Sequence, residues 1–384
     1  MRLIACLYDP RGQLSLDHPL VRLLLPAYRQ SCPHGGHWLR RQWLVLYDRA
    51  EDFQLLDDDS FGLVLGHPLL YPDRQASLAL LHGSPYRWLD RCRGHFALLQ
   101  GLSSSGHLLA ATDPLGLVPL YRLEHQGCQL LSNDLGWLSR LPLPLAVDSD
   151  ALLDWLSLGF PLGEGSGYQG VRTLGGGRYW VLKGRGAQTY HYRNWAGVPA
   201  PLTALAPQAL RTPHFGEAQL DWGLPKRQEQ ERPWRFQPGE RWAEVLFSEP
   251  RAALARQQDR YNADWAPLAE LARGNALFRL GHDLRWHWQG QARRQRLDLP
   301  DLALPGLDGQ LLASLPTLNL PPPRYPGLQP RHRLCRQGLG LWQQHGHDWS
   351  LARQLFGTLL GQTHSARGLQ ARLLYRQWQQ QCPG

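Results

Sequence analysis

Two short histidine clusters and one mixed cluster of arginines and tryptophans have the spacing that could support chemistry. His34 and His37 flank two glycines, and His345, His347 and Asp348 lie within four residues, so each group resembles part of a metal site. Neither cluster has cysteines or further acids at the usual ligand spacing. Solvated surface histidines explain both clusters better, and we predict no metal and no other cofactor.

The mixed cluster alternates basic and aromatic side chains over residues 285–296. Surfaces that bind single-stranded nucleic acid use this alternation, because bases stack on aromatic rings while cations hold the phosphates. A helix that packs through its tryptophans would show the same pattern, and the chain has 16 tryptophans. We therefore do not expect nucleic acid as the main partner. The candidate anion-binding residues are Arg285, Arg293, Arg294 and Arg296.

Positive charge is concentrated in the last third of the chain. Residues 251–384 hold 17 of the 41 basic groups but only 8 of the 32 acidic groups, and all 17 are arginines. Guanidinium groups bind carboxylates and phosphates in a planar, bidentate way. The asymmetry favours a partner protein or an acidic peptide for this region. Pairing of these arginines with acids of the first domain, or a merely solvated surface, is the alternative.

The six cysteines lie far apart and form no Cys-x-x-Cys pair, which predicts reduced, buried thiols rather than disulfides or zinc ligands. No apolar run approaches the roughly 20 residues of a membrane span. Asp9 comes too early for a secretory signal. We therefore expect a cytoplasmic protein that does not enter a membrane, and the sequence leaves its oligomeric state open.

The elements that would position these residues change in character along the chain. Apolar runs broken by small polar turns predict strand pairs in the first half, whereas residues 196–240 contain seven prolines and predict a linker without strands. From residue 241 the pattern becomes helical. We predict hairpins over 94–112, 119–132 and 178–192, helices over 19–30, 150–158 and 242–258, and a cap at Asp148 or Ser149 for the second helix.

Six collinear segments resemble the N-terminal domain of the asparagine synthetase family. The most specific is Asp-Pro-Leu-Gly-Leu-Val-Pro-Leu-Tyr at 113–121, which is similar at almost every position to the family's Arg-Asp-x-x-Gly-x-x-Pro-Leu-Tyr element. The residues that carry this element are Asp113, Gly116, Pro119 and Tyr121. The other segments are 1–9, 89–98, 131–135, 172–179 and 190–195, of which 89–98 and 172–179 each match one family strand.

The resemblance implies a class II glutamine amidotransferase-like domain over 1–195. Its fold is a four-layer αββα arrangement of the Ntn-hydrolase kind, and a mostly helical region follows, so the chain as a whole is α+β. We divide it into this domain, the proline-rich linker 196–240 and an arginine-rich helical region 241–384. Independently of the family, Gly116 and Pro119 predict a tight crossover between two strands, with Asp113 capping the turn.

The family's nucleophile is a cysteine at the position that Arg2 occupies here. A guanidinium stays protonated and cannot be a nucleophile, so we predict no catalytic residue and no glutaminase activity. The positions that would grip glutamine are also altered, because neither an arginine, an amide nor a carboxylate stands there. These degenerate pocket positions are Ser31, Leu65, Gly66 and His67.

The second half of the family carries a Ser-Gly-Gly-x-Asp-Ser loop that cradles pyrophosphate, and nothing in 196–384 reproduces it. Lasso-peptide cyclases are similar in lacking the nucleophile, but they keep the ATP loop. The sequence therefore predicts a degenerate, non-catalytic or accessory protein in peptide or natural-product amide formation. Two alternatives stay open: a divergent ATP-dependent, asparagine-synthase-like amide ligase, and a binding module for an acidic peptide or nucleic acid.

Overall fold

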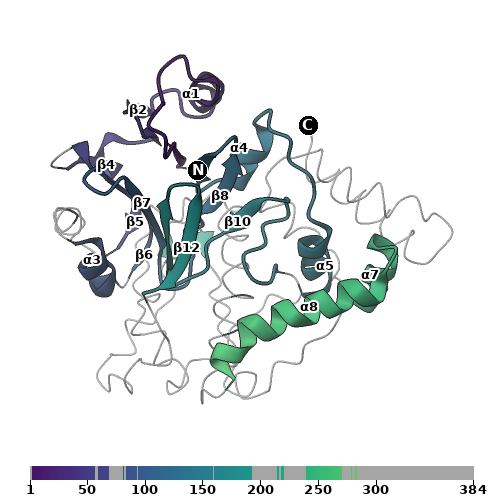
Figure 1. The fold of residues 1–384 in the computed structure, drawn as a ribbon. Coiled ribbons are helices and arrows are strands. Elements are labelled where there is room, and N and C mark those ends of the chain that lie inside the picture. Colours follow the sequence, from purple (N-terminus) through teal and green to yellow (C-terminus); the bar gives the residue numbers. More distant parts are fainter. Residues whose placement is uncertain are drawn as a thin grey trace, which may run out of the picture.

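The computed structural model describes residues 2–56, 59–68, 81, 84–92, 94–158, 160–192, 214–215, 218–219, 239–269, 278 and 282. Within these residues, twelve strands form two six-stranded antiparallel sheets that face each other (Figure 1). The first sheet has the order β10-β8-β9-β1-β3-β2, and the second has the order β12-β11-β7-β6-β5-β4.

The strands of the first sheet are β1 (Ile4–Tyr8), β2 (Gly36–Leu39), β3 (Trp43–Tyr47), β8 (Tyr121–His125), β9 (Cys128–Ser132) and β10 (Val171–Thr173). Those of the second are β4 (Phe53–Leu55), β5 (Phe61–His67), β6 (His95–Leu102), β7 (His107–Thr112), β11 (Arg178–Lys183) and β12 (Gly186–His191). The three predicted hairpins are confirmed as β6–β7, β8–β9 and β11–β12.

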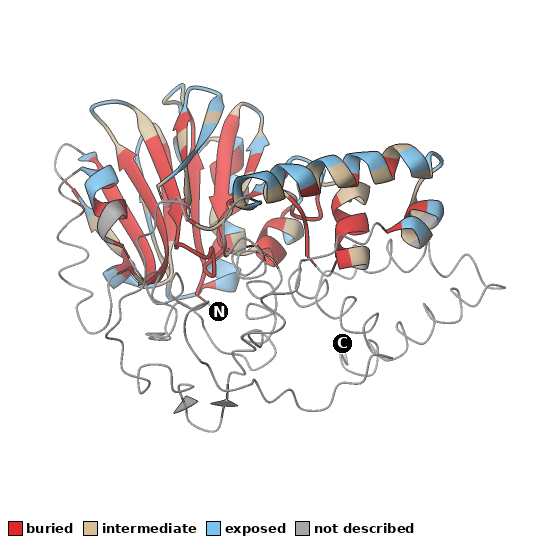
Figure 2. Cartoon of the chain, turned by 90° about the horizontal axis from the view of Figure 1, so that it is seen from below, coloured by how far each residue is buried: buried red, intermediate tan, exposed pale blue. Residues whose placement is uncertain are grey.

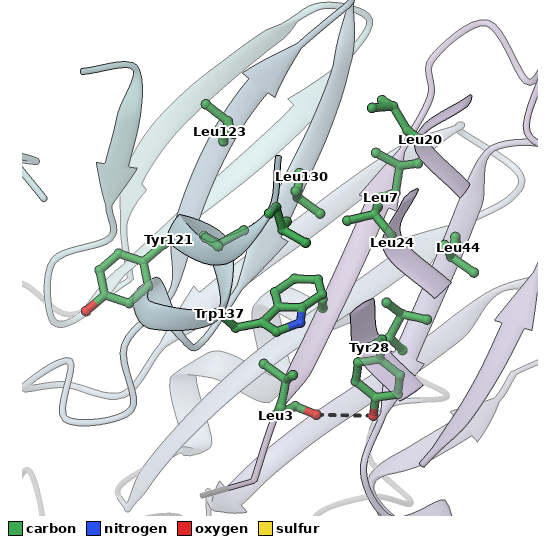
Figure 3. Packing of buried hydrophobic residues seen from close by; sticks show 14 of the residues in the cluster. Leu3, Leu7, Leu20, Leu24, Tyr28, Leu44, Tyr121, Leu123, Leu130 and Trp137 are labelled. Atoms are coloured by element: carbon green, nitrogen blue, oxygen red, sulfur yellow. Dashed lines mark hydrogen bonds between the residues drawn. The ribbon is translucent and has the colours of Figure 1, made fainter. Parts of the chain in front are cut away.

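The side chains of strand β1 contribute to two separate hydrophobic cores. Because successive side chains of a strand point to opposite faces, Ile4 and Cys6 pack between the sheets while Ala5 and Leu7 pack outward. The outward side chains meet helix α1 (Pro19–Ser31) and helix α4 (Leu135–Arg140), and Leu7 lies among their apolar residues in Figure 3. The first sheet is therefore buried on both faces.

The outer face of the second sheet is covered by helix α3 (Pro85–Arg91). Trp88 and Leu89 of α3 pack on Val64, Phe96 and neighbouring strand residues. With α1 and α4 on the other side, the layers run helix, sheet, sheet, helix, and the expected αββα arrangement is confirmed. Figure 2 shows the inner strands of both sheets coloured mainly as buried, whereas the edge strand β12 is largely exposed.

Helices follow the sandwich over the described residues 239–269, and most of the rest of the helical region predicted from 241 lies outside the described residues. Helix α5 (Ser149–Leu158) packs on α7 (Glu240–Leu246) and α8 (Pro250–Trp265), which continues into the 3₁₀ turn η6 (Ala266–Leu268) (Figure 1). Asp148 caps α5, since its carboxylate accepts the first backbone N–H groups of the helix. No helix in the described ranges is both long and apolar enough to cross a membrane.

Four boundaries differ from the sequence prediction. The helix expected over 242–258 is two helices, because Pro250 starts a new one. The strand matched to 89–98 begins only at His95, since 85–91 is helical. Residues 172–179 span two strands in different sheets. A two-residue pair, β13 (His214–Phe215) with β14 (Ala218–Gln219), lies in the stretch expected to lack strands.

Candidate functional site

Arg2 lies two residues before Ile4, the first residue of β1, and is almost completely buried, with 3% of its surface exposed. Its guanidinium donates to the carboxylate of Asp52, which is fully buried at the end of the 3₁₀ helix η1 (Ala50–Asp52). Opposite charges can remain in a protein interior because each compensates the other, and removing one costs about 3–5 kcal/mol. An internal ion pair therefore fills the position at which the resemblance places a nucleophile.

The backbone beside Arg2 is held by hydrogen bonds from two other elements. The Asn133 amide oxygen accepts the Ile4 N–H at 2.8 Å, and the Asn133 amide nitrogen donates to the Arg2 carbonyl oxygen at 2.9 Å. On the helix side, the Tyr28 hydroxyl donates to the Leu3 carbonyl oxygen at 3.4 Å (Figure 3). These bonds tie the backbone of residues 2–4 to α1 and to the residue that follows β9.

The cysteine thiols of the described residues are not poised for nucleophilic attack. These thiols are buried and form no disulfide, at Cys6, Cys32, Cys92 and Cys128. Burial raises the pKa of Cys6 far above its ordinary value, and it raises the pKa values of Cys32 and Cys128 to about 11. Because the thiolate is the reactive form, these three groups are inert near neutral pH.

The altered pocket positions fall in separate layers of the molecule. Ser31 is the exposed last residue of α1, outside the first sheet. Leu65 and Gly66 are buried in β5 of the second sheet, where Leu65 joins the core between the sheets. His67 lies at the end of β5, and the centroid of its ring is 5.6 Å from the ring centroid of His95 on β6. None of these four residues is an arginine, an amide or an acid, so the positions offer no group that could hold the carboxylate or the amine of glutamine.

Gly66 is required by the backbone conformation where β5 pairs with β6. Its φ is +98°, and a Cβ at this position would lie 2.5 Å from the His95 carbonyl oxygen. A side chain is therefore incompatible with the pairing of β5 and β6 at this point. Glycine at 66 is thus required by the sheet, and it has no side chain that could act on a substrate.

The segment 113–121 carries the chain from β7 in the second sheet to β8 in the first. The Asp113 carboxylate accepts the N–H groups of Leu115 and Val118, both at 2.9 Å, and Gly116 has φ +68°. Tyr121 is buried where β8 begins. This element is architecture: the aspartate replaces water for two buried donors, and the glycine permits the left-handed turn.

Helix α8 is attached to α5 by charged groups that sequence reasoning did not single out. Arg260 donates to the Asp154 carboxylate at 2.8 Å, and Arg256 donates to that of Asp150 at 3.0 and 3.1 Å. Burial raises the pKa of Asp154 to about 6, although Arg260 and Gln257 oppose this. Some C-terminal arginines thus pair with acids of the first half. Arg285, Arg293, Arg294 and Arg296 lie outside the described residues.

The histidine clusters are only partly visible. His34, just before β2, and His37, within β2, are both exposed. Over the described ranges, no three histidine, cysteine or acidic side chains converge as metal ligands would. The cluster at 345–348 lies outside those ranges.

Fold and site together define a four-layer αββα protein in which Arg2, just before the first strand, forms a buried ion pair with Asp52. No protein-family model and no curated protein matches the chain. Among solved structures, it is similar to glutamine phosphoribosylpyrophosphate (PRPP) amidotransferase from B. subtilis complexed with ADP and GMP, at TM-score 0.31 and 9% identity. A structure of the allosteric regulatory enzyme of purine biosynthesis gives TM-score 0.31 and 10% identity. Each similarity covers 50% of this chain and 49% of the other, so the chain spans about half the length of both.

Proposed function

We propose that this chain is a degenerate, asparagine-synthetase-like protein that acts without glutaminase catalysis as an accessory component of peptide or natural-product amide formation. The observation that carries the proposal is the buried pair of Arg2 and Asp52. A position that would have to present a nucleophile to solvent instead holds a cation used for internal stability.

Two further features support an inactive domain. The thiols of Cys6, Cys32 and Cys128 stay protonated at neutral pH, so none of them substitutes for the missing nucleophile. Ser31, Leu65 and His67, at positions where the resemblance places glutamine-binding groups, are neither an arginine, an amide nor a carboxylate. Losing the nucleophile and its substrate clamp together is expected when a fold is retained for binding or assembly rather than hydrolysis.

A glutaminase assay on three purified proteins tests the proposal. We expect no ammonia release from glutamine above a heat-inactivated control for the wild type, for Arg2→Cys, or for the matched control Arg29→Cys on the exposed side of α1. Arg2→Cys should not gain activity, because it removes the partner of buried Asp52 and supplies no glutamine pocket. Glutamine-dependent ammonia release by the wild type refutes the inactive domain.

A second assay separates the accessory role from an amide ligase with an unrecognised ATP site. The intact chain is incubated with ATP, magnesium and amino acids, and diphosphate is measured. We expect none above background. A gene for a precursor peptide or an amide ligase beside this one would support the accessory role, whereas diphosphate release by the chain alone would replace that role with the ligase.

A further inference from the structure

Turns from both sheets meet at the end of the sandwich opposite Arg2. The Gln129 side chain, at the start of β9, donates to the Arg185 carbonyl oxygen in the β11–β12 turn at 3.1 Å. The Tyr8 hydroxyl, at the end of β1, donates to the Gly106 carbonyl oxygen in the β6–β7 turn at 2.7 Å. These bonds fix the positions of the turns relative to one another, so the side chains they carry are brought to one surface.

Two guanidinium groups converge over Gly127 in the β8–β9 turn. A Cβ built on Gly127 would lie 3.3 Å from Nη2 of Arg11 and 3.8 Å from Nε of Arg185. The two nitrogens are therefore separated by no more than the sum of these distances, about 7 Å. Gln126 and Gly127 have φ +53° and +80°, so a tight left-handed turn with a glycine leaves room for both side chains.

Neither guanidinium is used to hold the fold together. Arg11 and Arg185 are exposed, and in the described part of the chain neither side chain forms an ion pair or a hydrogen bond. Asp9, two residues before Arg11, is buried, and its two carboxylate oxygens accept the backbone N–H groups of Arg11 at 3.0 Å and of Gln13 at 2.8 Å. Glu124 is exposed on the neighbouring strand β8. Two like charges thus lie close together without a compensating carboxylate between them.

Further cations lie on the adjoining turns. Arg41 is exposed, and its Cβ lies 3.8 Å from the position of a Cβ on Gly12, which follows Arg11. Lys183 is exposed at the end of β11, two residues before Arg185. Four cations against Asp9 and Glu124 leave a local positive balance that attracts anions.

We propose that Arg11 and Arg185 form a binding site for the phosphate group of a small anionic ligand, with Arg41 and Lys183 as cations at its rim. A guanidinium offers a fork of N–H donors to two oxygens of one anion. A tetrahedral phosphate has enough oxygens for two forks that approach from different turns. A planar carboxylate satisfies only one fork in this way, so phosphate fits the pair better.

This site is independent of the proposed function. Arg2 and Arg11 lie beyond opposite ends of β1, and about seven residues of extended chain at roughly 3.3 Å each separate them by about 20 Å. A phosphate bound at the turns would not touch the buried pair of Arg2 and Asp52. Either conclusion can therefore fail without the other.

Calorimetric titration of the intact chain with inorganic phosphate, at pH 7.5 and about 50 mM NaCl, tests the site. We expect saturable binding to one site by the wild type and at least tenfold weaker binding by Arg11→Gln/Arg185→Gln. Arg29→Gln, an exposed arginine on α1 away from these turns, should stay within twofold of the wild type. Dimethyl phosphate, which carries one charge and two fewer acceptor oxygens, should bind at least threefold more weakly than phosphate.

Several results would overturn the site. The site is refuted if the wild type shows no saturable phosphate binding or if the double variant binds phosphate as tightly as the wild type. It is also refuted if Arg29→Gln weakens phosphate binding as much as the double variant does. Loss of the folded circular-dichroism spectrum in the double variant would show that the arginines are structural. A single-stranded oligonucleotide that binds more than 100-fold more tightly than phosphate, with affinity rising with length, would identify a nucleic-acid surface instead.

Discussion

Replacing Asp52 by asparagine tests whether the ion pair with Arg2 is structural. Both side chains are buried, with 3% and 0% exposed, so water cannot compensate the charge that remains on Arg2. Breaking a buried pair by removing one partner costs about 3–5 kcal/mol. With a slope of about 2 kcal/mol per molar urea, we expect the unfolding midpoint of Asp52→Asn to fall by about 2 M.

Two further variants identify the cause of the loss. Arg2→Met/Asp52→Leu replaces both charges by apolar groups and should recover most of the stability lost in Asp52→Asn, because no uncompensated charge is left in the interior. Asp17→Asn breaks the pair with Arg22 on the surface, where the side chains are 85% and 68% exposed, and should cost less than about 1 kcal/mol. The reasoning is refuted if Asp52→Asn loses no more stability than Asp17→Asn does.

Two other predictions concern the attachment of α8 and the crossover between the sheets. Burial raises the pKa of Asp154 to about 6, so the folded chain binds the Asp154 proton more tightly than the unfolded chain does. The free energy of unfolding should therefore fall by about 3 kcal/mol as the pH rises from about 4 to 6. Urea unfolding at pH 4.5 and 7 should show most of this loss of stability in the wild type but not in Asp154→Asn. An equal loss in both proteins would assign the pH dependence to other groups. Asp113→Ala leaves two buried N–H donors without acceptors and should cost about 2–4 kcal/mol in the same assay. A loss below about 1 kcal/mol would show that the crossover holds without its aspartate.

Local chemistry made much of the sandwich predictable from the sequence. A short apolar run that ends at a turn identified β1, and small polar turns identified the three hairpins. The Asp113 crossover was predictable for the same reason, since its hydrogen bonds join residues two and five positions apart. Helix α3 and strands β2 and β4 were missed, because segments of three to seven residues carry too little periodicity to be distinguished from loops.

The sequence predicted the chemistry of Arg2 but not its partner in the folded chain. That Arg2 cannot be a nucleophile follows from its residue type alone. That it is buried beside Asp52 does not, because the two residues lie 50 positions apart and meet only after η1 folds against the start of β1.

The remaining charged contacts were likewise decided by the tertiary structure. Arg11 and Arg185 approach each other because strand register brings three turns to one end of the sandwich. Arg260 reaches Asp154 across 106 positions because α8 packs on α5. The sequence by itself determined which residues can carry charge, turn the chain or pair in strands. Which charges meet depended on sheet order and helix packing, since a side chain interacts over a few ångströms of space whatever its distance along the chain.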